Sequence, residues 1–418
     1  MTEHVLVFGV GYDIPERMRA FGEKTGGEVV TSVMCWPEHL DKMDDTDKHV
    51  RIVVLRPDAS DSEWLTLARA LHAAHPVTRI GSFYDDCRPQ AALIARDLGL
   101  ETHSPEIVEL IENKHAMRLR LADAGVEETA SAIVHSVEAL KEFAAEHGYP
   151  CVVKPVDGAA SKGVSVLGAP DGAESSFHRA SRINAGSRVA VEEFLAGNQY
   201  SVEGFSEKGE HVILAITRKY SDPDSLVELG HVLPAPLEPA QHAAIERHVV
   251  ETLNALDVEF GPTHTEIILT PNGPRVIETH LRTGGDEIWN LVTDATGVDM
   301  IECQLRQILG QTVLPGVRAA LSDTDRATRC EAIWFAGAPS SGTLVEVTGA
   351  DSEHPQGVTL EVLGKPGTQL SGLQNSFSRL ARARAHAATA DDALALARQA
   401  IAGLELVIRQ AADQTELL

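Results

Sequence analysis

Near-continuous apolar runs alternate with segments of helical periodicity in the first part of the chain. Residues 5–11 and 50–55 have the composition of strands buried on both faces, and residues 63–74 and 90–98 carry apolar side chains at helical spacing. Strands that alternate with helices are typical of a parallel α/β layer. We therefore predict an α/β domain at the N-terminal end.

After about residue 112 the pattern changes to many short strands. Two helices are predicted first, over 115–124 and 136–147, and short β-branched runs joined by tight turns follow. One long helix at about 240–256 interrupts these runs, and an alanine-rich amphipathic helix is predicted at 391–408. This pattern is typical of an α+β region with antiparallel sheet.

Net charge, hydropathy and cysteine content limit the possible partners and the cellular location of the protein. The 418 residues carry a formal net charge of -25, so the surface repels nucleic acid and anionic membrane. No apolar run approaches the ~18 residues of a membrane span, and the first residues lack the basic segment and cleavage site of a signal peptide. The five cysteines lie far apart without a CxxC pair, which indicates reduced thiols in a cytoplasmic protein.

Residues 151–167 combine two β-branched strands with a loop of small residues. Lys154 lies at the end of the first strand, and the glycine, alanine and serine residues of the loop let backbone N–H groups approach an anion closely. The segment therefore suits a phosphate held by amides and a lysine. A flexible hairpin loop with a solvated lysine fits it equally well.

Residues 188–205 contain a strand that breaks at Gly197-Asn198 and then restarts. Such a break exposes backbone groups that can pair with the polar edge of a base such as adenine, while Phe194 and Leu195 supply apolar surface. A plain hairpin is the simpler interpretation of this segment taken alone.

Residues 261–288 contain two strands around a Pro-Asn-Gly turn. If residues 271–273 form the loop, Glu266 opposes Glu278 on one face of the hairpin. Two facing carboxylates repel each other unless a cation lies between them, and oxygen ligands of this kind suit magnesium. The alternatives are that both acids lie on an exposed sheet face, or that the register is shifted by one residue.

The same hairpin pairs His264 with His280, and Arg282 follows two residues later. The turn Gly284-Gly285 comes directly afterwards. A cationic fork beside an amide-rich turn suits the stabilisation of an oxyanion.

The order of these motifs resembles that of the ATP-grasp superfamily, which includes biotin carboxylase, glycinamide ribonucleotide synthetase and the L-amino acid ligases that make dipeptides. The resemblance is carried by the lysine after Asn113, the Lys154 strand with its glycine loop, the Glu-Glu-Phe-Leu segment, and two glutamates followed by an arginine. It covers about residues 113–310 strongly and the two ends more weakly.

The resemblance implies a role for each motif residue. ATP would be bound by Lys114, Lys154, Ser161, Lys162, Gly163, Glu192, Glu193, Phe194, Leu195 and Gln199. Magnesium, as two ions, would be bound by Glu266, Glu278 and His280, and the substrate by His264, Arg282, Gly284, Gly285 and Asp286, with Arg282 and Lys154 as catalytic groups. Two positions depart from the family pattern: Gln199 stands where an acid is frequent, and His280 where an asparagine oxygen usually helps to bind magnesium. A ring nitrogen suits that metal less well.

The resemblance also implies a multidomain α/β and α+β chain with the ATP-grasp fold. An α/β pre-domain would span residues 1–112, a small lid subdomain 113–190, a large subdomain with hinge and metal site 191–310, and a β-rich cap with a terminal helix 311–418.

The implied reaction is the ATP-dependent joining of a carboxylic acid to an amine through an acyl phosphate. Two amino acids giving a dipeptide-like product are the leading substrates, and a homodimer is a family expectation. The alternatives are another ATP-grasp ligase or carboxylase, acting on a purine precursor or bicarbonate, and a nucleotide-binding regulatory module without catalysis. No Ser/His/Asp triad is required, because the nucleophile is the second substrate.

Overall fold

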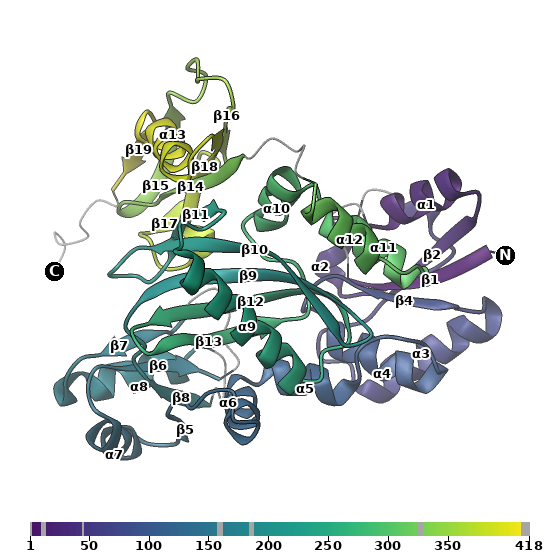
Figure 1. The fold of residues 1–418 in the computed structure, drawn as a ribbon, viewed down its shortest axis with the longest axis horizontal. Coiled ribbons are helices and arrows are strands. Elements are labelled where there is room, and N and C mark those ends of the chain that lie inside the picture. Colours follow the sequence, from purple (N-terminus) through teal and green to yellow (C-terminus); the bar gives the residue numbers. More distant parts are fainter. Residues whose placement is uncertain are drawn as a thin grey trace, which may run out of the picture.

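The computed structural model describes residues 2–9, 14–43, 46–156, 162–183, 188–323 and 329–410. Figure 1 shows the N-terminal domain on the right, the lid subdomain at the lower left, the large sheet in the centre and the C-terminal cap above it. Within the described residues, no helix is both long and apolar enough to cross a membrane.

The predicted parallel α/β layer forms the N-terminal domain. Its four strands are ordered β3-β2-β1-β4, and all neighbouring pairs are parallel. The strands are β1 (Thr2–Phe8), β2 (Glu28–Cys35), β3 (Ile52–Val54) and β4 (Arg79–Ser82), and the helices are α1 (Ile14–Thr25), α2 (Pro37–Leu40), the 3-10 turn η1 (Thr46–Lys48), α3 (Asp61–Ala74), α4 (Arg88–Leu98) and α5 (Pro105–Glu112).

The lid subdomain is a four-stranded antiparallel sheet covered by two helices. The strand order is β5-β8-β6-β7, with α6 (Lys114–Asp123) leading into it. Its elements are β5 (Ser131–Val134), α7 (Val137–His147), β6 (Cys151–Pro155), β7 (Ser165–Leu167), η2 (Pro170–Gly172), α8 (Ala173–Ser181) and β8 (Val189–Glu193). Ser136 caps α7 by accepting a hydrogen bond from the Ala139 N–H, because its hydroxyl satisfies an otherwise unpaired amide of the first turn.

The large subdomain and the cap share one eight-stranded sheet, ordered β13-β12-β9-β10-β11-β14-β18-β16. Its strands before residue 310 are β9 (Asn198–Glu207), β10 (Glu210–Ser221), β11 (Glu228–Leu233), β12 (Phe260–Thr270) and β13 (Gly273–His280). The helices of this part are α9 (Pro239–Ala255), α10 (Ile288–Thr296), α11 (Met300–Ile308) and α12 (Leu314–Leu321).

The cap differs from its prediction in two respects. Its strands β14 (Cys330–Gly337), β16 (Val358–Val362) and β18 (Arg379–Ala387) continue the large sheet, because β14 pairs with β11. The predicted terminal helix is also shorter: α13 (Ala390–Ala402) ends before Gly403, and β19 (Glu405–Arg409) follows. β19 joins β15 (Ser341–Thr348) and β17 (Gln369–Ser371) in a small separate sheet, with the 3-10 turn η3 (Ser376–Ser378) nearby in sequence.

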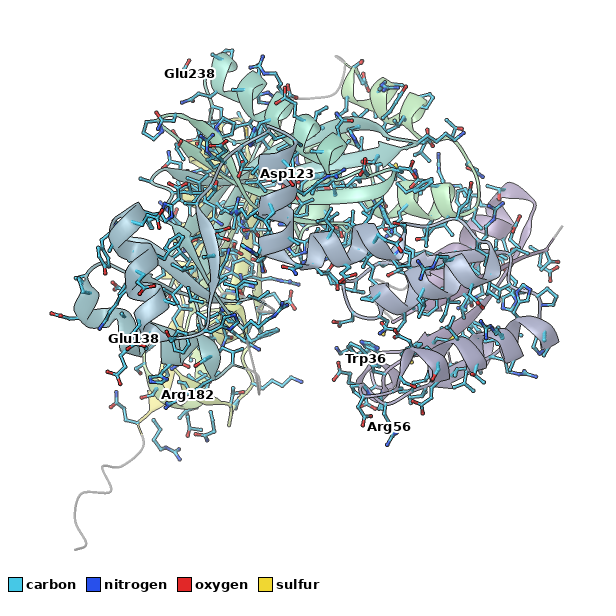
Figure 2. The ribbon with its side chains drawn as sticks, turned by 90° about the horizontal axis from the view of Figure 1, so that it is seen from below. Trp36, Arg56, Asp123, Glu138, Arg182 and Glu238 are labelled. Atoms are coloured by element: carbon cyan, nitrogen blue, oxygen red, sulfur yellow. The ribbon has the colours of Figure 1, made fainter. Side chains whose placement is uncertain are left out.

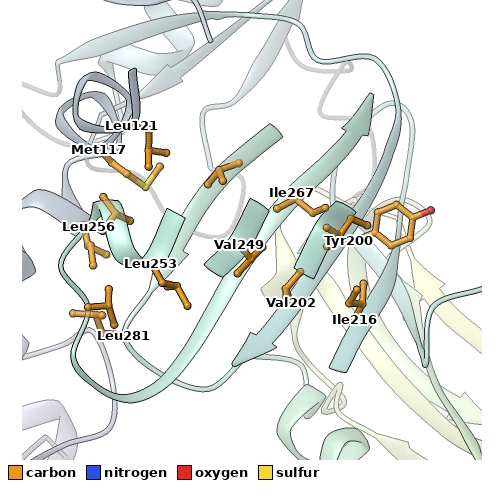
Figure 3. Packing of buried hydrophobic residues seen from close by; sticks show 14 of the residues in the cluster. Met117, Leu121, Tyr200, Val202, Ile216, Val249, Leu253, Leu256, Ile267 and Leu281 are labelled. Carbon is orange, nitrogen blue, oxygen red and sulfur yellow. The ribbon is translucent and has the colours of Figure 1, made fainter. Parts of the chain in front are cut away.

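A large apolar cluster lies between the central sheet and several helices, which include α5, α6 and α9 (Figure 3). Met117 and Leu121 on α6 and Leu253 on α9 are fully buried, and they belong to the same cluster as Val202 and Ile267 of the sheet. Burying such side chains contributes roughly 1.5–3 kcal/mol each. This packing fixes α6, and with it Lys114, against the sheet that carries the two glutamates.

The lid and the N-terminal domain project as separate lobes from the large sheet. Figure 2 shows Glu138 and Arg182 on the lid lobe and Trp36 and Arg56 on the N-terminal lobe. His103 contributes to the junction of the N-terminal domain with the large sheet, because its Nε2 donates to the Phe260 carbonyl oxygen at 2.9 Å.

His103 gives the stability a pH dependence. Burial lowers the pKa of His103 to about 3, whereas an unfolded histidine has a pKa of about 6.5. Between these values the unfolded chain binds more protons, so this group makes stability fall as the pH drops through that window. We expect His103→Gln to flatten the decline of the unfolding free energy between about pH 6.5 and 4, measured by urea denaturation. The exposed His147→Gln on α7 is the control, and an equal slope change in both variants would contradict the assignment.

Candidate active site

The β12–β13 hairpin brings Glu266 and Glu278 directly opposite each other, as the two-residue period predicts. The loop length and the strand pairing that produce this register differ from the prediction. Thr270 pairs with Gly273, so the loop has two residues, Pro271 and Asn272. A β-bulge at Ile277, between the pairs Ile267–Val276 and Glu266–Glu278, then restores the expected opposition.

Buried polar side chains from outside the hairpin hold this bulge. The Arg118 guanidinium, on α6, donates to the carbonyl oxygens of Val276 and Ile277. Glu127 accepts from the Val276 N–H at 2.8 Å and from Arg118 at 2.9 Å. Arg118 therefore binds the two carbonyl groups that precede Glu278.

Each facing carboxylate has a lysine of its own. Glu266 lies 2.5 Å from the Lys219 Nζ, and Glu278 lies 2.7 Å from the Lys114 Nζ. Burial alone would raise the pKa of both carboxyls, but the Lys219 charge holds the pKa of Glu266 well below its usual range, and Lys114 and His280 do the same for Glu278. Both acids are therefore ionised at neutral pH, and the lysines offset their repulsion.

One pocket of about 240 Å³ gathers most of the residues predicted to bind the nucleotide. The predicted residues that line it are Lys114, Lys154, Lys162, Glu192, Glu193, Phe194, Leu195, Gln199, Glu266 and Glu278. Apolar side chains complete the wall: Val152 and Val166 come from the lid sheet, and Ile268 and Ile277 from the hairpin. A flat base between two apolar surfaces, with charged groups at one end, fits such a pocket.

Three of these residues have local partners that the sequence did not indicate. Glu192 was predicted at the adenine hinge, but its buried carboxylate accepts from Lys154 at 2.8 Å and from Arg118 at 3.3 Å. Burial would raise the pKa of Glu192, but the Lys154 and Arg118 charges lower it to about 2. Glu192 therefore orients Lys154. Gln199, which the resemblance assigns to the ATP site, donates to Glu266 at 3.1 Å.

The lid loop is described only from Lys162 onwards. Ser161 lies outside the described residues, and Gly163 follows Lys162 with a φ of +76°. The Lys162 ammonium lies 5.0 Å from the ring centroid of Phe377, which belongs to η3 of the cap. A cation at this distance from an aromatic face is attracted to it, so the cap contacts the lid subdomain here.

Arg282 lies outside the 240 Å³ pocket, next to the N-terminal domain. Its Nε donates to Asp85 at 2.6 Å, and the His280 Nδ1 lies 3.3 Å from the same carboxylate oxygen. Asp85 follows β4 of the N-terminal domain, so the two domains meet at this corner. The arginine sits two residues beyond His280, which itself contacts Glu278 at 3.0 Å.

The turn after Arg282 packs closely against buried polar side chains, and its role in binding substrate stays a prediction. The Gly284 N–H donates to Glu203 at 3.3 Å, and a Cβ at this position would lie 2.8 Å from the His264 Nδ1. Close packing therefore requires glycine here. His264 also contacts Glu203, at 2.7 Å. Gly284 and His264 thus support each other behind the strands.

Asp286 faces the cap. Its carboxylate accepts two hydrogen bonds from Arg379, at 2.7 and 2.5 Å, and one from the buried His231 at 2.9 Å. Its φ of +53° is unusual for a residue with a side chain. Asp286 is therefore a link between the cap and the loop that carries Arg282 and Gly285, and its contact with substrate stays a prediction.

The donor set at the hairpin fits magnesium at two of the three predicted ligands. Glu266 and Glu278 offer ionised oxygens from facing strands. His280 fits less well, because both of its ring nitrogens lie against carboxylates. Burial would lower its pKa, but the Glu278 charge and the hydrogen bond to Asp85 raise it, and a protonated ring has no lone pair for a metal.

Sequence reasoning missed several charged residues of this region, among them Asp85, Arg118, Glu203 and Lys219. Lys219 is 3% exposed on β10, where it also pairs with Glu228. Lys219 follows Arg218 in the polar end of β10, so the strand pattern gave no signal for it. The other three lie on elements whose position relative to the hairpin depends on the tertiary fold.

Comparison with known families agrees with this geometry. Residues 147–289 match the family model of the ATP-grasp domain, and residues 334–409 match that of the L-amino acid ligase C-terminal domain 2. The chain therefore contains an ATP-grasp domain, followed by a segment that matches the C-terminal domain of L-amino acid ligases, and it resembles the carboxylate–amine ligase branch.

Three individual proteins illustrate the similarity. The crystal structure of an L-amino acid ligase from Bacillus licheniformis superposes with a TM-score of 0.79 at 20% identity, covering 98% of this chain and 99% of that one. Alanine–anticapsin ligase of Bacillus subtilis is 26% identical over 60% of this chain, and the protein y4rH of Sinorhizobium fredii is 28% identical over 77%. The matched regions span only 57% and 65% of the length of these two relatives.

Proposed function

We propose that this protein is an ATP-dependent ligase that joins the carboxylate of one amino acid to the amine of another. The observation that carries the proposal is the facing pair Glu266 and Glu278, with Lys114 and Lys154 at the same pocket. Arg282, two residues beyond the hairpin's last paired position, adds a cation where a carboxylate substrate would react.

In the first step, a carboxylate oxygen of the substrate attacks the γ-phosphorus of ATP, and the bond from that phosphorus to the ADP oxygen breaks. Lys114 and Lys154 bind the phosphates and offset their charge. Magnesium, held by Glu266 and Glu278, would neutralise further negative charge on the transferring group; two ions remain the expectation. The product of this step is an acyl phosphate.

In the second step, the nitrogen of a neutral amine attacks the acyl carbon. The carbon–oxygen bond to phosphate breaks, and the proton that the amine loses passes to the departing phosphate, giving an amide and inorganic phosphate. Arg282 stabilises the negative charge on the carbonyl oxygen. Its Nε is held by Asp85, so the orientation of the guanidinium is fixed before substrate binds.

Charges near Arg282 favour a substrate that carries both an acid and an amine. Glu112, at the end of α5, lies close enough to Asp85 and His280 for their charges to affect it. Burial and the Asp85 charge raise the pKa of Glu112 to about 7. Two carboxyl groups beside an arginine suit an ammonium next to a carboxylate, which is the pattern of an α-amino acid.

An ADP-release assay with pools of amino acids tests the proposal. Turnover should require two amino acids, or one in both roles, and mass spectrometry should detect a product heavier than either. Turnover with bicarbonate or a purine precursor instead would support the other ATP-grasp reactions. Tight ATP binding without turnover in any pool would indicate a regulatory module and contradict the proposal.

Lys154→Ala is expected to weaken nucleotide binding by roughly ten- to a hundredfold, as loss of a charge-assisted hydrogen bond of about 1.5–3 kcal/mol implies. Glu192 keeps its contact with Arg118 in this variant, so the lid sheet should remain folded. Calorimetric titration with ATP measures the effect. Lys141→Ala, on the exposed face of α7, is the matched control, and unchanged affinity in Lys154→Ala would remove this lysine from the nucleotide site.

A further inference from the structure

A buried glutamate and a buried histidine lie between the strand that carries Glu266 and the turn that follows Arg282. Glu203 on β9 is 0% exposed, and His264 on β12 is 4% exposed. The two residues oppose each other in the antiparallel pairing of these strands, and the His264 Nδ1 lies 2.7 Å from the Glu203 Oε1. The large sheet therefore holds this ion pair away from water.

The histidine ring contacts a second carboxylate through its other nitrogen. The His264 Nε2 lies 3.4 Å from the Glu266 Oε1, and Glu266 follows His264 by two positions on the same strand. Ionised carboxylates only accept hydrogen bonds, so the ring donates from both nitrogens. His264 thus joins Glu203 to one of the two acids that would bind magnesium in the proposed reaction.

Three donors surround the Glu266 carboxylate. Lys219 and His264 contact its Oε1 at 2.5 and 3.4 Å, and the side-chain amide of Gln199 donates to its Oε2 at 3.1 Å. An ionised carboxylate has about four lone-pair sites, so these contacts leave about one, on Oε2. The donors therefore fix the direction in which Glu266 presents an oxygen to the nucleotide pocket that it lines.

The other end of the ion pair contacts the turn after Arg282. The second oxygen of Glu203, Oε2, accepts a hydrogen bond from the Gly284 N–H at 3.3 Å. A Cβ on Gly284 would lie 2.8 Å from the His264 Nδ1 and 3.1 Å from the Glu203 Oε2, which is too close without movement. The turn therefore packs directly on the pair, and a displaced turn would displace the ring.

We propose that Glu203 and His264 are positioning residues that couple the turn after Arg282 to the magnesium-binding oxygen of Glu266. The proposal rests on the metal role that the proposed function gives to Glu266. The contacts form a continuous path from the Gly284 amide through Glu203 and His264 to Glu266. One buried pair thus aligns the acyl side and the phosphate side of the site.

A test of this role needs variants that keep the local charge constant. Loss of His264 alone would leave the Glu203 charge near the metal and attract magnesium, whereas loss of Glu203 alone would leave an imidazolium that repels it. The double variant Glu203→Gln/His264→Gln keeps the net charge of the pair, and Gly284→Ala changes no charged group. Both variants therefore report on position and not on charge.

Calorimetric titration with a non-hydrolysable imido analogue of ATP, at a series of magnesium concentrations, measures the effect. The magnesium midpoint is the concentration that gives half of the gain in analogue affinity. We expect this midpoint to rise by about 10- to 100-fold in the double variant, the usual cost of removing groups that orient a metal ligand. It should also rise in Gly284→Ala, although residue 284 lies outside the hairpin. The magnesium-free affinity should stay near that of the wild type, because none of the three substituted residues lines the nucleotide pocket.

His4→Gln is the control for the replacement of a buried histidine. Its ring nitrogens contact Pro76 and Ser32 in the N-terminal domain, and it does not line the pocket. This variant should lose stability but keep the wild-type magnesium midpoint. An unchanged midpoint in the double variant or in Gly284→Ala overturns the proposal, and if one of these two variants does not fold, the other decides.

The measurement needs no turnover, so a failure of the ligase reaction appears separately, as a wild-type protein that binds the analogue but forms no product. A wild-type protein whose analogue affinity does not depend on magnesium overturns the metal role of Glu266, and with it this proposal. A wild-type gain with magnesium that persists undiminished in both variants overturns the positioning role alone.

Discussion

Glu278→Gln is expected to abolish ligase turnover while the fold remains intact, with a loss of at least about a hundredfold in kcat. Replacing groups that merely support a metal ligand costs 10- to 100-fold, and this change neutralises a ligand itself. The amide keeps the size of the side chain, so packing around the hairpin is preserved. ADP release measured over a range of magnesium concentrations detects the loss.

A stability measurement and a control variant test whether the loss of activity in Glu278→Gln arises at the metal site. Urea denaturation should give a midpoint near that of the wild type, because Lys114 and His280 lose an ionic partner but remain partly accessible to solvent. Glu210→Gln is the matched control, since Glu210 pairs with Arg318 on the exposed surface of the same sheet. Near-normal activity in Glu278→Gln would count heavily against the proposed metal site.

Arg282→Lys is expected to lower kcat by about 10²–10³, the usual cost of removing one oxyanion-stabilising donor. Lysine keeps the positive charge but not the planar fork, so the contact with Asp85 and the orientation toward substrate are lost together. ATP affinity should change little, because Arg282 does not line the nucleotide pocket. Single-turnover kinetics and ATP titration separate the two quantities.

Arg275→Lys controls for a general disturbance of the hairpin. Arg275 lies on the same strand, where its guanidinium contacts only the neighbouring Pro274 carbonyl among the hydrogen bonds identified. This variant should keep wild-type kinetics. A drop in ATP affinity in Arg282→Lys as large as the drop in kcat would show that the arginine acts on nucleotide binding and not on the acyl centre.

The strand pattern predicted the opposition of Glu266 and Glu278 because side-chain direction alternates along a strand. It did not predict how the register arises. The two-residue loop alone would place Glu278 one position out of line, and the bulge at Ile277 corrects this. The bulge is bound by Arg118, which lies 159 residues away in the sequence, so local periodicity carries no information about it.

The ion-pair partners of charged residues could not be predicted from the local sequence either. Glu192 had the sequence context of a hinge, but its carboxylate binds Lys154 because β6 and β8 pair in the lid sheet. Asp286 had the context of a substrate loop, and its ion pair with Arg379 of the cap was not indicated by the sequence. In both cases the decisive neighbour comes from another strand.

The C-terminal helix was predicted too long, because Gly403 ends α13 and the alternating residues of β19 follow it.

The continuity of the sheet from β11 into β14 has a consequence for building chimaeras. Exchanging the segment after residue 329 for that of a relative would place a foreign strand against β11, where Trp334 lies over Gly230 and leaves no room for a side chain there. A donor strand with a different residue facing Gly230 would leave the two edges poorly joined, and exposed strand edges promote aggregation. Substrate range in such hybrids would be altered more safely by changing loops than by transplanting the whole segment.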